Sequence, residues 1–317
     1  MVSVVNQTFK VFMCNNSPLY VGNCVRYMIA GDIKDKLFVS FYYDHTQGVF
    51  MIDHEKAFAR SAIKDQNLNT YHSLPLEHSK TCPCYTMNVN PDIFSFQSTN
   101  TFVRLACSTL VLDSKDNLLL TRRDKKLRSF PLAWVNPGGR LDPGETLDQC
   151  ALRELKEEVG IDIDVKEGAT KGSVRYLYAG RECQIKPFMV YESTYPTHLD
   201  IGFPKVQYLV VFYFVRIGCE NTKIKIKIQD SEIDKGIWIN LPYLIDTMEN
   251  KKGSSELLNC HTILPSGTHK ADFLPSETFE GVYPNIIKEG IGEGHLIAIK
   301  NYFYNNHRAG MEVEGKL

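Results

Sequence analysis

The chain has 317 residues, of which 43% are apolar or aromatic, and its formal net charge at pH 7 is −1. This length exceeds that of one ordinary domain, and the apolar content is sufficient for a sizeable core. The near-neutral charge provides no bulk attraction to nucleic acid or to an anionic membrane, so any contact with RNA must come from a local basic patch.

The positions of cysteine and histidine bear on metal sites and on the cellular compartment. Cys82-Pro83-Cys84 is the only close cysteine pair, and no second pair with zinc-site spacing accompanies it. The nine histidines show no paired ligand spacing either. We therefore expect free thiols in a reducing compartment, and no zinc site.

No segment of the sequence has the pattern of a membrane span or a secretory leader. The longest apolar run, residues 208–215, is too short to cross a bilayer, and no apolar region follows a basic start. We expect a soluble protein of the cytoplasm or nucleus. The ending Gly315-Lys316-Leu317 is similar to a peroxisomal Ser-Lys-Leu signal with Gly in place of Ser, which leaves a peroxisomal location as a minor alternative.

The first 95 residues and the residues after 250 differ in pattern from the middle of the chain. Apolar runs at 9–13 and 37–43 predict a small strand-rich N-terminal extension over 1–95, for which the sequence indicates no role. The segment 251–317 is loop-like and then predicts a helix from His295 to Tyr304.

Residues 100–250 alternate strand and helix signals and form the central predicted unit. In chain order we expect a strand at 105–112, a turn at 113–117, strands at 118–121, 188–191, 207–215 and 237–239, and a helix at 241–248. Lys223, Lys225 and Lys227 alternate with isoleucine, which is typical of a strand with one solvated face at a sheet edge.

A further helix is predicted between residues 147 and 159 from its start and stop signals. Thr146 followed three residues later by Gln149 is a capping-box pattern, and Gly160 is a favourable residue just beyond a helix C-terminus. At about 100° per residue, Leu155 and Val159 share one face of this helix.

Three carboxylates gather on another face of the same helix. Glu154, Glu157 and Glu158 are spaced i, i+3 and i+4, an arrangement that opposes helix formation by a few tenths of a kcal/mol per pair. A hard divalent cation such as Mg²⁺ or Mn²⁺ would offset this repulsion, because it takes oxygen ligands and shares its other positions with substrate phosphates. The spacing therefore predicts a metal site.

The residues before the helix predict a loop where backbone approaches a ligand closely. Asn136-Pro137-Gly138-Gly139 and Asp142-Pro143-Gly144 are turn-rich, so the loop can offer a carbonyl oxygen. Arg153 lies within folding reach of Glu145, which suggests an ion pair that holds the loop onto the helix.

The whole segment from Gly139 to Ile161 resembles the Nudix box. Its pattern is Gly, five residues, Glu145, seven residues, and then Arg-Glu-Leu-Lys-Glu-Glu-Val-Gly-Ile. Resemblance to the Nudix hydrolase family implies an α+β fold, an α/β/α sandwich around a mixed sheet, and hydrolysis of a nucleoside diphosphate linked to another group.

The resemblance also implies roles for the residues of the box. Glu154, Glu157 and Glu158 would bind Mg²⁺ or Mn²⁺, the Gly139 carbonyl would be a further ligand, and Glu145 would pair with Arg153. Glu154 is also expected to orient or deprotonate the attacking water. In some family members the base lies on a later loop instead, and Glu232 is an acidic candidate in that region.

Upstream of the box, Arg123 and Arg128 are candidates for phosphate binding, because a guanidinium can hold a phosphate through two hydrogen bonds. Their spacing is similar to the signature of coenzyme A diphosphatases within the family. Asp124, Leu132 and Asn136 depart from that signature, so the match is partial.

Downstream of the box, the sequence resembles mRNA-decapping members of the family. The segments Tyr191–Pro196 and Gly202–Lys205 carry this resemblance, which implies release of 7-methyl-GDP and 5′-monophosphate RNA from capped RNA. Tyr191, Tyr195 and Phe203 are candidates for stacking on the cationic base, with a role in the core as the alternative.

These observations predict a Mg²⁺- or Mn²⁺-dependent diphosphatase whose substrate is capped RNA. The alternatives are a coenzyme A or nucleotide-sugar diphosphatase and, in a different class, a Nudix domain that binds without catalysis. Retention of every acidic residue of the box disfavours a non-catalytic role.

Overall fold

The structure is a computed structural model that describes residues 9–31, 36–60, 70–94, 100–170, 173–250, 257–264, 266, 269–279, 282–284 and 289–314. The chain forms two compact units. Unit 1 contains Met1–Cys107, Gly139–Cys150 and Pro187–Phe212, and unit 2 contains Ser108–Gly138, Ala151–Lys186 and Tyr213–Leu317. The Gly-Lys-Leu ending lies outside the described residues.

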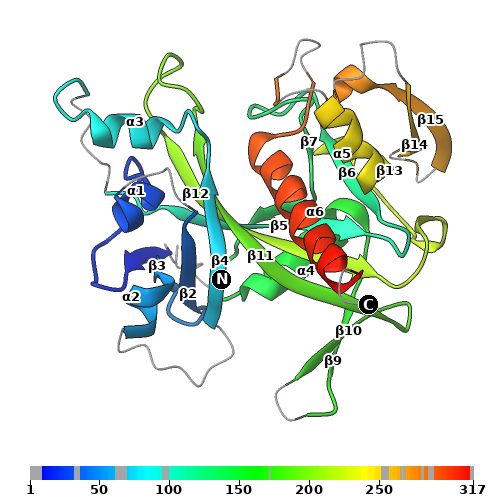
Figure 1. Ribbon diagram of the computed structural model, residues 1–317, viewed down its shortest axis with the longest axis horizontal. Coiled ribbons are helices and arrows are strands. Elements are labelled where there is room, and N and C mark those ends of the chain that lie inside the picture. Colours follow the sequence, from blue (N-terminus) through cyan, green and yellow to red (C-terminus); the bar gives the residue numbers. More distant parts are fainter. Residues whose placement is uncertain are drawn as a thin grey trace, which may run out of the picture. The chain divides into compact units, whose positions relative to one another are not determined.

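Unit 1 contains a mixed sheet with three short helices (Figure 1). Its strands follow the order β1 (Lys10–Met13), β3 (Val49–His54), β2 (Phe38–Asp44), β4 (Thr70–His78) and β11 (Arg181–Tyr195). The β1/β3 and β4/β11 pairs are parallel, whereas β2 is antiparallel to β3 and β4. Its helices are α1 (Val25–Ala30), α2 (Glu55–Arg60) and α3 (Pro83–Val89).

The predicted strand-rich character of residues 1–95 is thus confirmed by β1 to β4. The runs at 9–13 and 37–43 are the strands β1 and β2. The parallel pairing of β4 with β11 joins Leu76 to Val190, so the N-terminal strands continue into a strand from the middle of the chain.

Unit 2 is built on antiparallel strands in the order β5 (Arg104–Leu112), β6 (Asn117–Arg123), β13 (Ile233–Asn240), β14 (Leu257–Ile263) and β15 (His269–Pro275). Residues 108–112 of β5 belong to this unit. β7 (Trp134–Val135) pairs with β6, and β9 (Asp164–Glu167) and β10 (Val174–Tyr178) continue antiparallel into the start of β11. The remaining elements are β8 (Gly138–Arg140), β12 (Val206–Ile217), η1 (Asn221–Lys223), η2 (Ser276–Thr278), α4 (Leu147–Val159), α5 (Leu241–Asn250) and α6 (Glu293–Glu314).

These elements confirm the α+β class with mixed strand pairing, and most predicted elements of residues 100–250 are present. The helix predicted at 147–159 is α4, with the same ends. The predicted strands correspond to β5, β6, β11, β12 and β13, several of them longer than expected. None of the helices in the described segments combines the length and apolar character that a membrane span requires.

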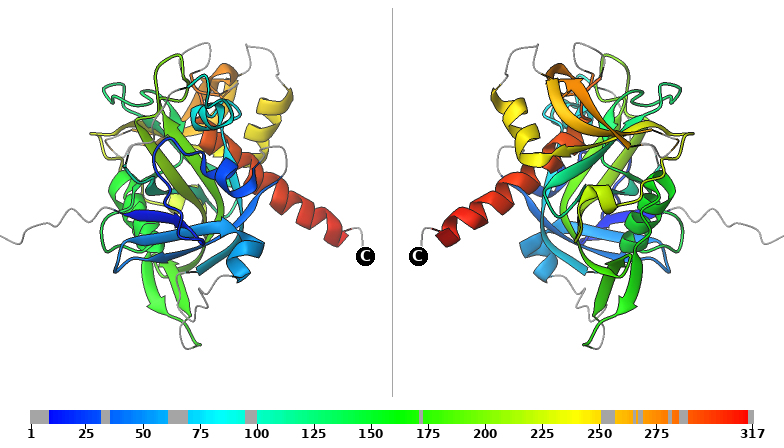
Figure 2. Two further views of the ribbon diagram at one scale, coloured as in Figure 1. Left: turned by 90° about the vertical axis from the view of Figure 1, so that its left-hand side faces the viewer. Right: turned by 90° about the vertical axis from the view of Figure 1, so that its right-hand side faces the viewer.

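The prediction of a loop-like segment after residue 251 is wrong for β14 and β15, which form an antiparallel pair (Figure 2). In β14 the buried residues Leu258 and Cys260 alternate with the outward-facing Asn259 and His261. Alternation of this kind is typical of a half-buried strand. The helix predicted from His295 to Tyr304 is also longer, as α6.

The structure also corrects the prediction of an edge strand from the lysine–isoleucine alternation. Ile224, Ile226 and Ile228 are buried, as an alternating pattern requires. However, the segment is η1 followed by extended chain outside any strand, and the Lys227 N–H donates to the Val159 carbonyl at 2.9 Å. The segment therefore satisfies the end of α4 instead of guarding a sheet edge.

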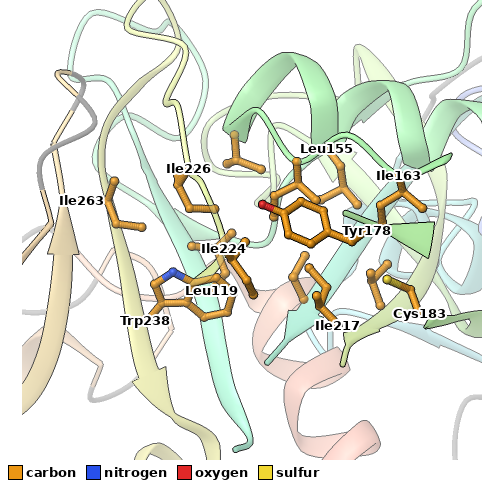
Figure 3. Close-up of a cluster of buried hydrophobic side chains, with 14 of the residues drawn as sticks. Leu119, Leu155, Ile163, Tyr178, Cys183, Ile217, Ile224, Ile226, Trp238 and Ile263 are labelled. Atoms are coloured by element: carbon orange, nitrogen blue, oxygen red, sulfur yellow. The ribbon is translucent and has the colours of Figure 1, made fainter. Parts of the chain in front are cut away.

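The core of unit 2 is an apolar cluster between α4, the strands and the chain after η1 (Figure 3). Leu155 and Val159 of α4 are fully buried in it, together with Leu119 of β6 and Trp238 of β13. Tyr178 contributes both its ring and its hydroxyl, which accepts a hydrogen bond from Lys225 N–H at 2.8 Å. This packing fixes the rotation of α4, and with it the direction of the carboxylate face.

Replacement of Gly160 by Ala should destabilise the protein by about 1–3 kcal/mol, because its backbone is left-handed and close to a neighbour. Gly160 has φ +70°, and an added Cβ would lie 3.0 Å from the Lys227 Cβ and 3.1 Å from its backbone nitrogen. Gly180→Ala is the matched control, since Gly180 has φ +77° with nothing within 4 Å. Urea unfolding should show a larger loss for Gly160→Ala, and equal losses would contradict the contribution of the close contact.

Candidate active site

Helix α4 begins with the reciprocal hydrogen bonds that its sequence predicts. The Gln149 side chain accepts from Thr146 N–H at 2.8 Å, and the Thr146 hydroxyl accepts from Gln149 N–H at 3.2 Å. At the other end, Gly160 N–H donates to the Lys156 carbonyl at 3.1 Å. Both ends of the helix are therefore fixed locally, and its length follows from these residues.

The carboxylate face of α4 combines two buried acids with one exposed acid. Glu154 is 9% exposed and Glu158 is 7% exposed. The Glu157 side chain is 54% exposed. The structure thus places the three predicted ligands on one helix, with the inner pair largely withdrawn from water.

Glu158 lies in the least favourable position for a negative charge. Burial raises its pKa to about 8, and the carboxylates of Glu154 and Glu232 add to this increase. The Gly138 N–H, which donates to Glu158 Oε2 at 3.0 Å, and the Arg123 guanidinium both oppose it. A carboxylate among other carboxylates is stabilised most effectively by a cation bound between them.

Arg153 pairs with the acids next to it on the helix. Its Nη1 lies 2.7 Å from Glu154 Oε1 and 3.1 Å from Glu157 Oε2. In unit 1, Glu145 Oε2 accepts from Asp142 N–H at 3.0 Å and so closes its own loop. The ion pair between Arg153 and Glu145 stays a prediction.

The loop before the helix is fastened to β5 within unit 2. The Pro137 carbonyl accepts from Thr109 N–H at 2.7 Å and from the Thr109 hydroxyl at 3.1 Å. This holds Gly138 in position to donate to Glu158. In unit 1, the Gly139 carbonyl accepts a weak S–H contact from Cys150 at 3.9 Å, and its role as a metal ligand stays a prediction.

The donor set fits a hard divalent cation. Glu154, Glu157 and Glu158 offer three carboxylates on one helix. Mg²⁺ and Mn²⁺ prefer such oxygens and keep positions for water and phosphate. Burial of Glu154 and Glu158 without a cation is costly, so the residues present fit the group that the box implies.

Two residues that the sequence did not indicate as functional lie close to this face. His295 of α6 is partly buried, and its desolvation together with the Arg123 guanidinium lowers its pKa to about 3, so the ring is neutral at physiological pH. Its Nδ1 accepts from Asn136 N–H at 3.1 Å, which assigns the proton to Nε2. Asn136 is 1% exposed, and its side-chain amide has no hydrogen-bond partner among the described residues. Only the fold brings 136 and 295 together, so no local sequence signal could have found this pair.

Of the two predicted phosphate-binding arginines, one lies near the carboxylates. Arg123 acts electrostatically on both Glu158 and His295, and its Nε donates to the Ser129 carbonyl at 3.3 Å. Arg128 is exposed on the loop after β6. Neighbouring Arg122 has a structural role, since it pairs with Asp234 at 2.8 Å and Glu289 at 2.7 Å.

The three aromatic candidates differ in exposure. Tyr191 is 6% exposed, and its position in β11 opposite Glu77 makes it part of the unit 1 sheet. This burial favours the core alternative for Tyr191 over stacking on a substrate. Phe203 and Tyr195 are 48% and 41% exposed and can present ring faces to a ligand.

Comparison with known proteins identifies the part of the chain that contains this helix. Residues 103–257 match the NUDIX domain. This part of the chain is a Nudix domain. The resemblance to the Nudix family that the box predicted is therefore confirmed for this part of the chain.

Curated relatives match over part of their length. The m7GpppN-mRNA hydrolase NUDT17 of Danio rerio is 26% identical over 195 residues, covering 61% of this chain and 60% of that relative. The human protein of the same name is 28% identical over 169 residues, 52% of this chain and 47% of its own. Nudix hydrolase 3 of Caenorhabditis elegans is 36% identical over 122 residues, 38% of this chain and 46% of its own. The chain thus spans about half the length of the curated relatives it matches.

Solved structures show a weaker likeness. A MutT protein from Methanosarcina mazei Go1 is 17% identical, covering 47% of this chain and 84% of its own, with a TM-score of 0.33. A Nudix hydrolase from Alicyclobacillus acidocaldarius is 20% identical, covering 48% of this chain and 86% of its own, with a TM-score of 0.35. The assignment rests on the domain match and not on these superpositions.

Replacement of Glu158 by Gln should raise the stability of the metal-free protein and remove its stabilisation by Mg²⁺. A raised carboxyl pKa means that the folded state holds a proton that the unfolded state has released, so wild-type stability without metal should fall as pH rises from about 4.5 to about 8. Glu158→Gln should remove this decline and raise the metal-free thermal midpoint at pH 9 by about 2–4 °C, or about 1 kcal/mol. It should also abolish the stabilisation that Mg²⁺ gives the wild type.

The exposed Glu167 of β9 provides the control for this measurement. Glu167→Gln should keep the wild-type response to pH and Mg²⁺ in scanning calorimetry. An equal Mg²⁺ response in Glu158→Gln and wild type would remove Glu158 from the metal site.

Proposed function

We propose that this protein is a divalent-metal-dependent Nudix diphosphatase that hydrolyses the 7-methylguanosine cap of mRNA, releasing 7-methyl-GDP and leaving 5′-monophosphate RNA. The observation that carries the proposal is the carboxylate face of α4 within the Nudix domain. Burial of two acids beside a third on one helix face is destabilising unless a cation binds there, so the arrangement favours a metal site.

The residues around the metal divide the work of an anhydride hydrolysis. Glu154 and Glu158 would hold Mg²⁺ or Mn²⁺ with Glu157, and the Gly139 carbonyl would be a further ligand. When bound, the metal stabilises negative charge that develops on phosphoryl oxygens. Arg153 pairs with Glu154 and Glu157 and so orients them. Glu154 would orient or deprotonate the attacking water. Arg123, beside Glu158, is suited to a substrate phosphate.

The choice of capped RNA over other diphosphates is supported by the relatives named m7GpppN-mRNA hydrolase. It is also supported by the exposed rings of Tyr195, at the end of β11, and Phe203, in the loop between β11 and β12. A methylated guanine carries positive charge and is attracted to an aromatic face. The partial coenzyme A signature at Arg123 and Arg128 has no comparable support.

A substrate panel tests the proposal. The purified chain is incubated with capped RNA, coenzyme A, ADP-ribose and dinucleoside polyphosphates, with Mg²⁺ or Mn²⁺, and the products are identified by mass. We expect 7-methyl-GDP and monophosphate RNA from capped RNA, with no product when the metal is chelated. Cleavage of coenzyme A to 4′-phosphopantetheine without cleavage of capped RNA would refute the cap assignment. If no substrate of the panel is cleaved in the presence of metal, the assignment as an enzyme is refuted.

Methylation of the cap should affect the rate. If a ring of unit 1 contacts the cationic base, 7-methylguanosine-capped RNA should be cleaved about 2- to 30-fold faster than the unmethylated form, from roughly 0.5–2 kcal/mol of cation–π energy. Phe203→Leu should reduce this preference, because leucine keeps the apolar bulk and removes the ring.

Ile201 is the matched control for this measurement, since it is 66% exposed in the same loop and carries no ring. Ile201→Ala should keep the methyl preference. A preference that survives in both Phe203→Leu and Tyr195→Leu would show that neither ring recognises the base.

A further inference from the structure

A cluster of three thiols and one imidazole lies inside unit 1, apart from the carboxylates of α4. Cys24 precedes α1, His78 ends β4, and Cys82 and Cys84 begin α3. All four side chains are buried, with exposed fractions of 0%, 8%, 2% and 0% respectively. The sequence predicted no zinc site, because ligands that come from three separate segments leave no local spacing to detect.

The side-chain atoms are separated by distances that a tetrahedral metal requires. The ligand atoms of Cys24, His78 and Cys82 all lie within 4.8 Å of one another. Cys24 Sγ lies 3.6 Å from His78 Nδ1. With Zn–S near 2.3 Å and Zn–N near 2.0–2.1 Å, a tetrahedral angle places sulfur and nitrogen about 3.6 Å apart. The observed separation matches the one expected of two ligands on one zinc ion.

Cys84 is the candidate for a fourth donor. Its thiol interacts with that of Cys82, which in turn interacts with Cys24 and His78. The Cys84 Sγ also lies 3.5 Å from the Gln207 Oε1. Cys82 is therefore the shared neighbour of the other three groups, as expected of one ligand in a closed set.

The Cys82 sulfur also accepts a backbone N–H. Tyr85 N–H donates to Cys82 Sγ at 3.5 Å. A neutral thiol is a weak acceptor, whereas a thiolate accepts such bonds well. The Tyr85 N–H is therefore the kind of outer contact that a metal-bound thiolate needs.

The surrounding contacts hold the cluster in place. Glu192 of β11 accepts from Val25 N–H at 2.8 Å and Arg26 N–H at 3.1 Å, and its Oε1 accepts from Gln207 Nε2 at 2.6 Å. The Asn88 side chain of α3 joins α3 to the segment before α1, since it accepts from Cys24 N–H at 2.8 Å and donates to the Gly22 carbonyl at 3.1 Å. These contacts thus hold the backbone around Cys24 in place.

We propose that Cys24, His78, Cys82 and Cys84 bind a structural zinc ion. The donor set is soft, with three sulfurs and one nitrogen, and is unlike the oxygen set on α4, so Mg²⁺ would not compete for it. With all four positions taken by protein and the cluster buried, the site has no open position for catalysis. Zinc would join β4, α1 and α3. These elements are short, so their own packing holds them together only weakly.

The metal content of the full chain tests this proposal. Protein expressed with zinc present and purified without chelator should contain one zinc ion per chain by mass spectrometry of the metal. Cys82→Ser should lose most of it, whereas Cys183→Ser, a buried thiol of unit 2, should keep it. Glu158→Gln should also keep it, because its oxygens belong to the separate α4 site.

Cobalt and thiol titration complete the test if Cys82→Ser fails to fold. Cobalt-substituted wild type should show the visible bands of a tetrahedral thiolate site, and a mercurial reagent should release zinc from wild type as its thiols react. Removal of zinc should lower the unfolding temperature. Purified wild type that takes up neither zinc nor cobalt, or Cys82→Ser and Cys84→Ser variants that keep full zinc, would overturn the assignment.

Discussion

The constraint on which the site depends is that two carboxylates of α4 are withdrawn from water while a third stays exposed beside them. Glu154 and Glu158 are 9% and 7% exposed, and burial raises the pKa of Glu158 to about 8. The apolar face of the same helix supplies the stabilisation that makes this tolerable, because Leu155 and Val159 are fully buried in the core of unit 2 (Figure 3). One helix therefore carries both the packing that fixes its rotation and the charge that calls for a cation.

Several distant segments are organised around this helix. Lys227 and Gln229 N–H groups donate to the carbonyls of Val159 and Glu158, each at 2.9 Å, and so satisfy its last turn. The C-terminal segment adds His295, a neutral ring held by Asn136. Arg122 fastens that segment through Glu289 and reaches Asp234 with its other nitrogens. Structure outside residues 100–250 thus contributes to the surroundings of the box.

The sequence was sufficient where interactions are local. Helix α4 was predicted with its observed ends, because Thr146, Gln149 and Gly160 encode its caps within a few residues. Strands β14 and β15 were not predicted, although buried and exposed residues alternate along β14. The contact between Asn136 and His295, and the group of Cys24, His78 and Cys82, depend on segments brought together only by tertiary structure.

The central claim, that the α4 carboxylates exist to bind a divalent cation, is tested most directly by locating the ion. Crystals of the full chain grown with Mn²⁺, measured near the manganese absorption edge, should show an anomalous peak within about 2.5 Å of carboxylate oxygens of Glu154 and Glu158. The same map should show whether the Gly139 carbonyl is a further ligand. A well-ordered carboxylate face with no anomalous peak, in crystals where Mn²⁺ is bound elsewhere, would contradict the account.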